Sequence, residues 1–236
     1  LNSGARPIGL SSANRTSSYA PISPSTGGNI RIVAGGIHSN SSSAAFNVNT
    51  AGTLTFEPFS TSFLSTVTFP ATASTTTVGN LIVGTSGNTA DLTVGAAVTS
   101  ASEVTYRGGS IAVNANVRSD NGSVAFLSTV ASKTYTTTNS PTITAAQGVT
   151  ISSTGESSTV STGTGAISAA TVRISGASTI TSAAPITSRG VVEISSSAGN
   201  TTVSGGVNAA GDIVIVGGDV AVNAAQTTTT VSYTHL

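Results

Sequence analysis

The side chains that could carry chemistry are few, and they are scattered along the chain. A polysaccharide lyase or hydrolase needs clustered carboxylates, or a carboxylate-bound metal beside an Arg or Lys. Asp212 and Asp219 lie close in sequence, but both follow glycine at an expected turn, where Asp commonly bonds to the backbone. We therefore expect no catalytic, cofactor-binding or metal-binding residues. The complete acidic set is Glu57, Asp91, Glu103, Asp120, Glu156, Glu193, Asp212 and Asp219.

Two further arrangements of charged residues depend on how the chain folds. An enzymatic groove would require distant charged residues to converge, namely Asp91, Glu103 and Asp120 with Arg107 or Arg118. Arg173 and Glu193 are 20 positions apart and are expected to form an exposed ion pair between neighbouring repeats. His38 lies in a polar turn, and the other histidine falls in the last six residues, so a metal site or a Ser-His-Asp triad has little support.

The composition points to an all-β chain and argues against several classes of partner. Charged residues are 7% of the sequence, against a usual share of about a quarter, and the eight basic and eight acidic residues cancel. A neutral chain has no electrostatic footprint for nucleic acid. No apolar run approaches the roughly 20 residues that a membrane-spanning helix needs. The absence of Cys rules out disulfides and thiolate chemistry, while abundant Thr and Val favour strands.

Short apolar alternations recur about every twenty residues. They include Val149-Thr150-Ile151, Val172-Arg173-Ile174, Val192-Glu193-Ile194 and Ile213-Val214-Ile215, and their last residues are 23, 20 and 21 positions apart. Alternation with period two sends Val and Ile to one face and polar residues to the other. A unit this small cannot bury its own apolar face, so it must stack on its neighbours.

This repeat predicts a right-handed parallel β-helix (β-solenoid) with about 20 residues per coil. Roughly eleven coils would form a rod about 50 Å long at the spacing of paired strands. The stack requires Ile174, Ile194 and Ile215 to form one file. The alternative is a tandem array of immunoglobulin-like sandwiches, which repeat over about 100 residues and build on a buried Trp. Trp is absent here.

The chain divides into four expected regions. Coils are expected over 1–45 and 78–230, and an irregular segment or insertion over 46–77. That segment contains five of the six Phe residues, Phe46, Phe56, Phe59, Phe63 and Phe69, which either fill a widened coil or belong to an excursion packed on the rod. Residues 231–236 match a translated sequencing adapter and the chain opens on Leu1, so 1–230 is interpreted as an internal slice of a longer protein.

Several strands resemble a known group of proteins. Gly28-Asn29-Ile30-Arg31-Ile32, Gly109-Ser110-Ile111-Ala112-Val113 and Gly211-Asp212-Ile213-Val214-Ile215 are similar to repeats of the filamentous-haemagglutinin-like adhesins and of repetitive autotransporter adhesins. The resemblance covers most of residues 27 to 230. It implies an extracellular or surface-attached bacterial rod that displays binding regions away from the cell. The matching positions are structural, so it assigns no site residues.

The sequence thus predicts a non-catalytic adhesin segment that meets a receptor or glycan on a host or cell surface. It predicts no nucleic-acid partner, no cofactor and no membrane span. One alternative is a fragment of a β-helical polysaccharide lyase or hydrolase. Another is an ice-binding solenoid, which needs Thr-x-Thr in register on successive coils. Thr53-Leu54-Thr55 and Thr66-Val67-Thr68 are present, but no such ladder is expected at the twenty-residue register.

Overall fold

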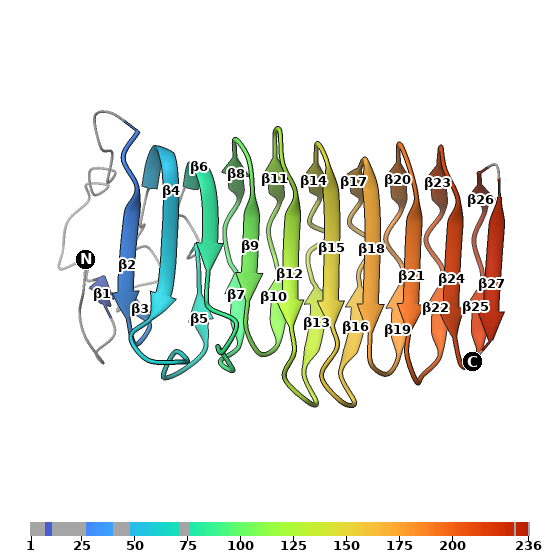
Figure 1. Ribbon diagram of the computed structural model, residues 1–236, viewed down its shortest axis with the longest axis horizontal. Helices are drawn as coiled ribbons and strands as arrows, with labels where there is room; N and C mark the ends of the chain where they lie inside the picture. Colours follow the sequence, from blue (N-terminus) through green and yellow to red (C-terminus); the bar gives the residue numbers. More distant parts are fainter. Residues whose placement is uncertain (1–7, 11–26, 40–47, 71–75, 229, 236) are drawn as a thin grey trace.

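The computed structural model describes residues 8–10, 27–39, 48–70, 76–228 and 230–235. In this part of the chain, parallel strands stack into a β-solenoid of about nine turns, roughly 22 residues apart (Figure 1). The described residues contain no helix, and so none that could cross a membrane. The predicted parallel β-solenoid is confirmed and the sandwich alternative is wrong. At about 4.8 Å per coil, nine turns make a rod about 40 Å long.

Among the described residues the coils present three faces. A seventeen-stranded sheet covers two of them, and β4 (Val48–Pro58) and β6 (Thr76–Val83) run across both. The long-strand face consists of β2 (Ile30–Ala34), β9 (Val104–Arg107), β12 (Val124–Ser128), β15 (Gly148–Ser153), β18 (Thr171–Gly176), β21 (Val192–Ser196), β24 (Ile213–Gly217) and β27 (Val231–His235). The short-strand face consists of β8 (Val98–Ser100), β11 (Val117–Ser119), β14 (Ile143–Ala145), β17 (Ile167–Ala169), β20 (Ile186–Ser188), β23 (Val207–Ala209) and β26 (Gln226–Thr227).

The third face is an eight-stranded parallel sheet, and a further pair lies at the N-terminal end. The eight strands are β5 (Val67–Thr68), β7 (Leu92–Val94), β10 (Ile111–Val113), β13 (Thr134–Thr137), β16 (Thr159–Thr162), β19 (Ile180–Ser182), β22 (Thr201–Val203) and β25 (Val220–Val222). The separate pair is β1 (Ile8–Leu10) with β3 (Ile37–Ser39). Every pairing in the described part of the chain is parallel, and each connects one coil to an adjacent one.

Alternation along each strand builds the interior. In β18, β21 and β24 every second residue is buried, and the residues between them are more exposed. The pairing aligns Ile174 with Ile194 and Ile194 with Ile215, all fully buried. The predicted vertical file of isoleucines is therefore confirmed. Each of these side chains is buried by its neighbours above and below, so the stack rather than the single coil supplies the core.

The first coils turn their corner within a continuous strand. β4 and β6 pass from one face to the next near Gly52 and Gly79, where their register shifts. A Cβ atom at Gly79 would lie 2.0 Å from the carbonyl oxygen of Ala51, so no other residue fits this close crossing. In later coils a short break separates the two faces, as between β8 and β9, so one long strand becomes two.

The Phe-rich segment lies in the coils wherever it is described. Phe56, on β4, has its ring centroid 4.8 Å from that of Phe63 and 5.4 Å from that of Phe69, and all three side chains are buried. Phe59 is 51% exposed, and Phe46 lies outside the described residues. The described parts of 46–77 thus contribute both strands and core to the stack.

Five of the residues interpreted as adapter sequence, 231–235, also lie on the stack. β27 pairs in parallel with β24, and Tyr233 aligns with Ile215. Tyr233 is 47% exposed because no described strand covers the other side of this last turn. The number of turns is below the expected eleven because several corner loops lengthen their coils and part of the N-terminal region lies outside the described residues.

Candidate functional site

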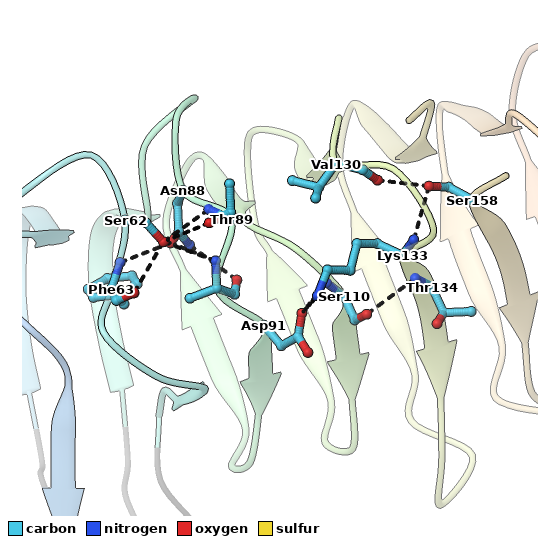
Figure 2. A network of polar contacts seen from close by, with 11 residues as sticks. Ser62, Phe63, Asn88, Thr89, Asp91, Ser110, Val130, Lys133, Thr134 and Ser158 are labelled. Carbon is cyan, nitrogen blue, oxygen red and sulfur yellow. Dashed lines mark hydrogen bonds and ion pairs between the residues drawn. The ribbon is translucent and has the colours of Figure 1, made fainter. Parts of the chain in front are cut away.

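Polar side chains gather at one corner of the solenoid, where the long-strand face meets the eight-stranded sheet (Figure 2). Successive coils cross this corner through loops 84–91, 108–110 and 129–133, and the next coil follows through 154–158. The loops differ in length, with 108–110 the shortest of the four. We call this region the polar corner.

A buried asparagine joins three successive coils. Asn88 is 2% exposed, and its Oδ1 atom accepts hydrogen bonds from the Ser62 hydroxyl (3.0 Å) and from the backbone N–H of Phe63 (3.2 Å). Its Nδ2 atom donates to the Arg107 carbonyl oxygen at 2.9 Å. The side chain thus bonds to the coil before its own and the coil after it. Because every polar atom of this amide has a partner, Asn88 is a structural crosslink.

Asp91 and Lys133 form an ion pair that spans the coil between them. Lys133 Nζ lies 2.8 Å from Asp91 Oδ1, and the backbone N–H of Ser110 donates to the same oxygen at 2.8 Å. Gly109 makes this approach feasible, since a Cβ atom there would lie 2.5 Å from Asp91 Oδ1. The pair therefore ties β7, β10 and β13 together and leaves no net charge.

The pKa of Asp91 reflects two opposing effects. Partial burial disfavours the charged carboxylate and raises the pKa. The hydrogen bond from Lys133, that from the Ser110 amide and the charge of Lys133 together outweigh it, so the pKa lies below its ordinary value. Asp91 is therefore ionised at neutral pH, which suits a crosslink and not a proton donor.

A pocket of about 320 Å³ lies at the polar corner beside this network. It lies over the short loop 108–110, between the longer loops on either side. Arg107, at the end of β9, contributes the charged group of its lining. The full lining is Thr85, Ser86, Asn88, Arg107, Gly108, Leu127 and Thr129.

The residues of the conceivable enzymatic groove are divided between two corners of the solenoid and do not form one site. Arg118 forms an ion pair with Asp120 at the corner between the short-strand and long-strand faces. Glu103 also lies at that corner, because a Cβ atom at Gly122 would lie 2.7 Å from its Oε1 atom. Asp91 and Arg107 lie at the polar corner, at the other end of β9.

The other candidates are equally dispersed. Asp212 precedes β24 and Asp219 follows it, so the strand separates their carboxylates. Arg173 and Glu193 are aligned in register and form the expected exposed ion pair, which confirms that prediction. His38 is in β3, and its side chain is not among the described groups. The described residues contain no group of three or more His, Cys, Asp or Glu side chains that could hold a metal ion.

The eight-stranded sheet carries a single column of hydroxyl residues that the sequence did not reveal, although it is not a Thr-x-Thr ladder. Its strands align Thr134 with Thr159 and also connect Thr136, Ser161, Thr181 and Thr202 in one column. These residues alternate with buried ones and point outward. The column has no constant period, because loops of unequal length separate its members by 25, 20 and 21 residues. We call this column the hydroxyl face.

Comparison with known proteins found no matching family model, no matching curated protein and no matching solved structure.

Proposed function

We propose that this chain is a non-catalytic rod segment of a secreted or surface-attached bacterial adhesin. The observation that carries the proposal is the uninterrupted stack of parallel coils along one axis (Figure 1). Such a rod keeps a binding region at its far end at a distance from the surface to which the rod is attached. Weak contacts made by many coils add through effective concentration, so a long face binds more firmly than any single coil.

Three further observations support the proposal. The surface carries few charges, and four ion pairs among the described residues neutralise eight of them: Arg31–Glu57, Arg118–Asp120, Lys133–Asp91 and Arg173–Glu193. The polar corner crosslinks coils, as a load-bearing rod requires. The strands that resemble filamentous-haemagglutinin-like repeats, such as Ile213-Val214-Ile215 in β24, occupy core positions of the solenoid.

The test is to display the chain on a non-adherent bacterium and to measure attachment to epithelial cells under flow. We expect attachment above that of cells bearing a display scaffold alone. The purified chain should release no reducing ends from polygalacturonate or other acidic polysaccharides. Cleavage of a polysaccharide would overturn the non-catalytic part, and attachment at scaffold level would overturn the adhesive part.

A second candidate, an ice-binding solenoid, is favoured by the hydroxyl face. Threonine hydroxyls repeated at about the 4.8 Å strand spacing offer ordered water a regular array. If this function holds, the chain shapes growing ice crystals into facets. The Thr181→Lys variant, which places a charge in the middle of the column, should lose that effect while keeping its fold. Unshaped ice with the wild-type chain would reject this candidate.

A further inference from the structure

The pocket at the polar corner arises from unequal loop lengths. Loop 108–110 is short, so the longer loops of the coils before and after it rise on both sides. Gly108 keeps the floor low, because a Cβ atom there would lie 2.8 Å from the Ala90 carbonyl oxygen and 2.8 Å from Leu92 Cγ. The hollow is thus a consequence of the backbone arrangement, and rigid crosslinks at Asn88 and Asp91 fix both loops that flank it.

The chemistry of the lining is mixed in a specific way. Arg107 is exposed, and its guanidinium forms no ion pair with any residue of the described chain. Leu127, its register partner on β12, adds an apolar patch. Thr85, Ser86 and Thr129 add hydroxyl groups from the flanking loops. The nearby Asp91 is already paired with Lys133, so it leaves Arg107 as the charge that an incoming ligand meets.

We propose that this pocket binds a carboxylate-bearing pyranose, the acidic sugar unit of a surface glycan. A guanidinium binds a carboxylate through two parallel hydrogen bonds, the hydroxyls suit the sugar hydroxyls, and Leu127 suits the C–H face of the ring. The volume of about 320 Å³ is at the small end of ligand pockets, which suits one sugar. The assignment rests on the proposed adhesive function, because it names the ligand class that the rod contacts.

The experiment titrates the full 236-residue chain with methyl β-D-glucuronide and with methyl β-D-glucoside, which lacks the carboxylate. Binding is followed by calorimetry or by NMR shifts. We expect saturable binding of the glucuronide and at least tenfold weaker binding of the glucoside, because the glucoside cannot form the charge-assisted hydrogen bonds to Arg107. The methyl glycoside of N-acetylneuraminic acid is a second arm, which distinguishes sialylated from uronate-bearing glycans.

Variants localise the binding. Arg107→Ala should weaken glucuronide binding about tenfold or more, and Arg107→Lys should restore part of it. Arg173→Ala removes an ion-paired arginine from the same long-strand face and should leave glucuronide binding unchanged. Thr129→Trp, which fills the pocket from an exposed position, should abolish binding, whereas Thr164→Trp at another corner should not. Circular dichroism checks that each variant keeps its β structure.

Equal binding of the glucuronide and the glucoside, wild-type affinity in Arg107→Ala, or no saturable binding of either acidic sugar to the folded chain would overturn the assignment. Failure of the sugar-binding proposal can be distinguished from failure of the proposed adhesive function. Attachment under flow without any acidic-sugar binding would reject the pocket and leave the adhesive rod intact. Polysaccharide cleavage would reject the rod proposal whatever the result at Arg107.

Discussion

The buried aromatic rings of the described solenoid all lie in its first half, between Phe56 and Tyr135, among aliphatic side chains, whereas the buried apolar residues of the second half are aliphatic. One column of aligned residues runs through Phe56, Val83, Tyr106 and Phe126, and continues through a file of isoleucines, Ile151, Ile174, Ile194 and Ile215. Both halves keep the same parallel pairing. The comparison teaches that each coil requires an apolar side chain at this inward position, but that the size of the side chain can vary from coil to coil.

The two halves bury different kinds of hydroxyl group, since only the aromatic half contains buried tyrosines. In the aliphatic half, small hydroxyls fill the interior, and Thr162 Oγ1 donates to Ser182 Oγ at 3.2 Å while Thr201 Oγ1 donates to the Val216 carbonyl at 2.7 Å. In the aromatic half, Tyr106 donates to the Phe69 carbonyl oxygen at 3.0 Å, but the Tyr135 hydroxyl is buried without a partner. The aliphatic half also has a buried hydroxyl without a partner, that of Ser153, so both halves carry the cost of unpaired polar groups.

The largest effect is expected from removing a ring at the centre of the aromatic half. Phe126 is fully buried, with its ring centroid 5.7 Å from that of Tyr106 and 5.5 Å from that of Tyr135. Phe126→Ala should lower the free energy of unfolding by about 3–5 kcal/mol, as measured by urea denaturation. Phe59→Ala, at a half-exposed ring, is the control and should cost below about 0.5 kcal/mol. A cost near that of the control would show that the rings do not form a packed core.

The matching side-chain truncation in the aliphatic half should lower the free energy of unfolding by a smaller amount. Ile194 is fully buried in its file, and Ile194→Ala should lower the free energy of unfolding by about 2–4 kcal/mol, because fewer atoms leave the core. Val191→Ala, at an exposed position just before β21, is the control. If Ile194→Ala proved more costly than Phe126→Ala, the two halves would not differ in packing as described.

The two buried tyrosines should respond in opposite directions. Tyr106→Phe removes the hydrogen bond to the Phe69 carbonyl and should cost about 1 kcal/mol. Tyr135→Phe removes an unpartnered buried hydroxyl and should be neutral or stabilising. The midpoints of denaturation of the two variants give the comparison directly. A similar loss in both would mean that the Tyr135 hydroxyl has a partner in solution.

The smallest effect concerns pH. Because the folded-state pKa of Asp91 is lowered, its contribution to stability is present above the ordinary carboxyl pKa and is lost as pH falls through the folded pKa. Asp91→Asn should therefore lower stability at pH 7 by below about 1 kcal/mol, with the difference from wild type shrinking in acid. The stability difference is small because the Asp91–Lys133 ion pair is partly exposed to solvent. Asp212→Asn, at a residue without an ion pair in the described chain, is the control, and an equal loss at pH 3 and pH 7 would contradict the assignment.

The sequence predicted the solenoid because burial of alternate residues is a local property that repeats along the chain. Val192-Glu193-Ile194 and its counterparts show it directly. It did not predict the hydroxyl face, because alignment of Thr136 with Ser161 depends on the lengths of the intervening loops. A search that allowed each loop its own length would have found that column.

The pocket at the polar corner was likewise hidden from the sequence. Its lining comes from three coils, and its depth depends on the contrast between loop 108–110 and its neighbours. A Gly-Gly pair such as Gly108-Gly109 is typical of a tight corner, but the position of Arg107 beside that corner depends on the strand register. The sequence also left open whether the Phe-rich segment is a coil or an excursion. It contains Phe56 and Phe63 but does not show that their rings are in contact.

Nearest-neighbour stacking has a mechanical consequence. Each winding is bonded to the one above and the one below, so tension applied to the chain ends peels the terminal winding before any other. Every detachment would free roughly 22 residues, or about 75 Å of extended polypeptide, while the remainder stays intact. A tether of this design lengthens in steps under load and thereby dissipates a sudden pull.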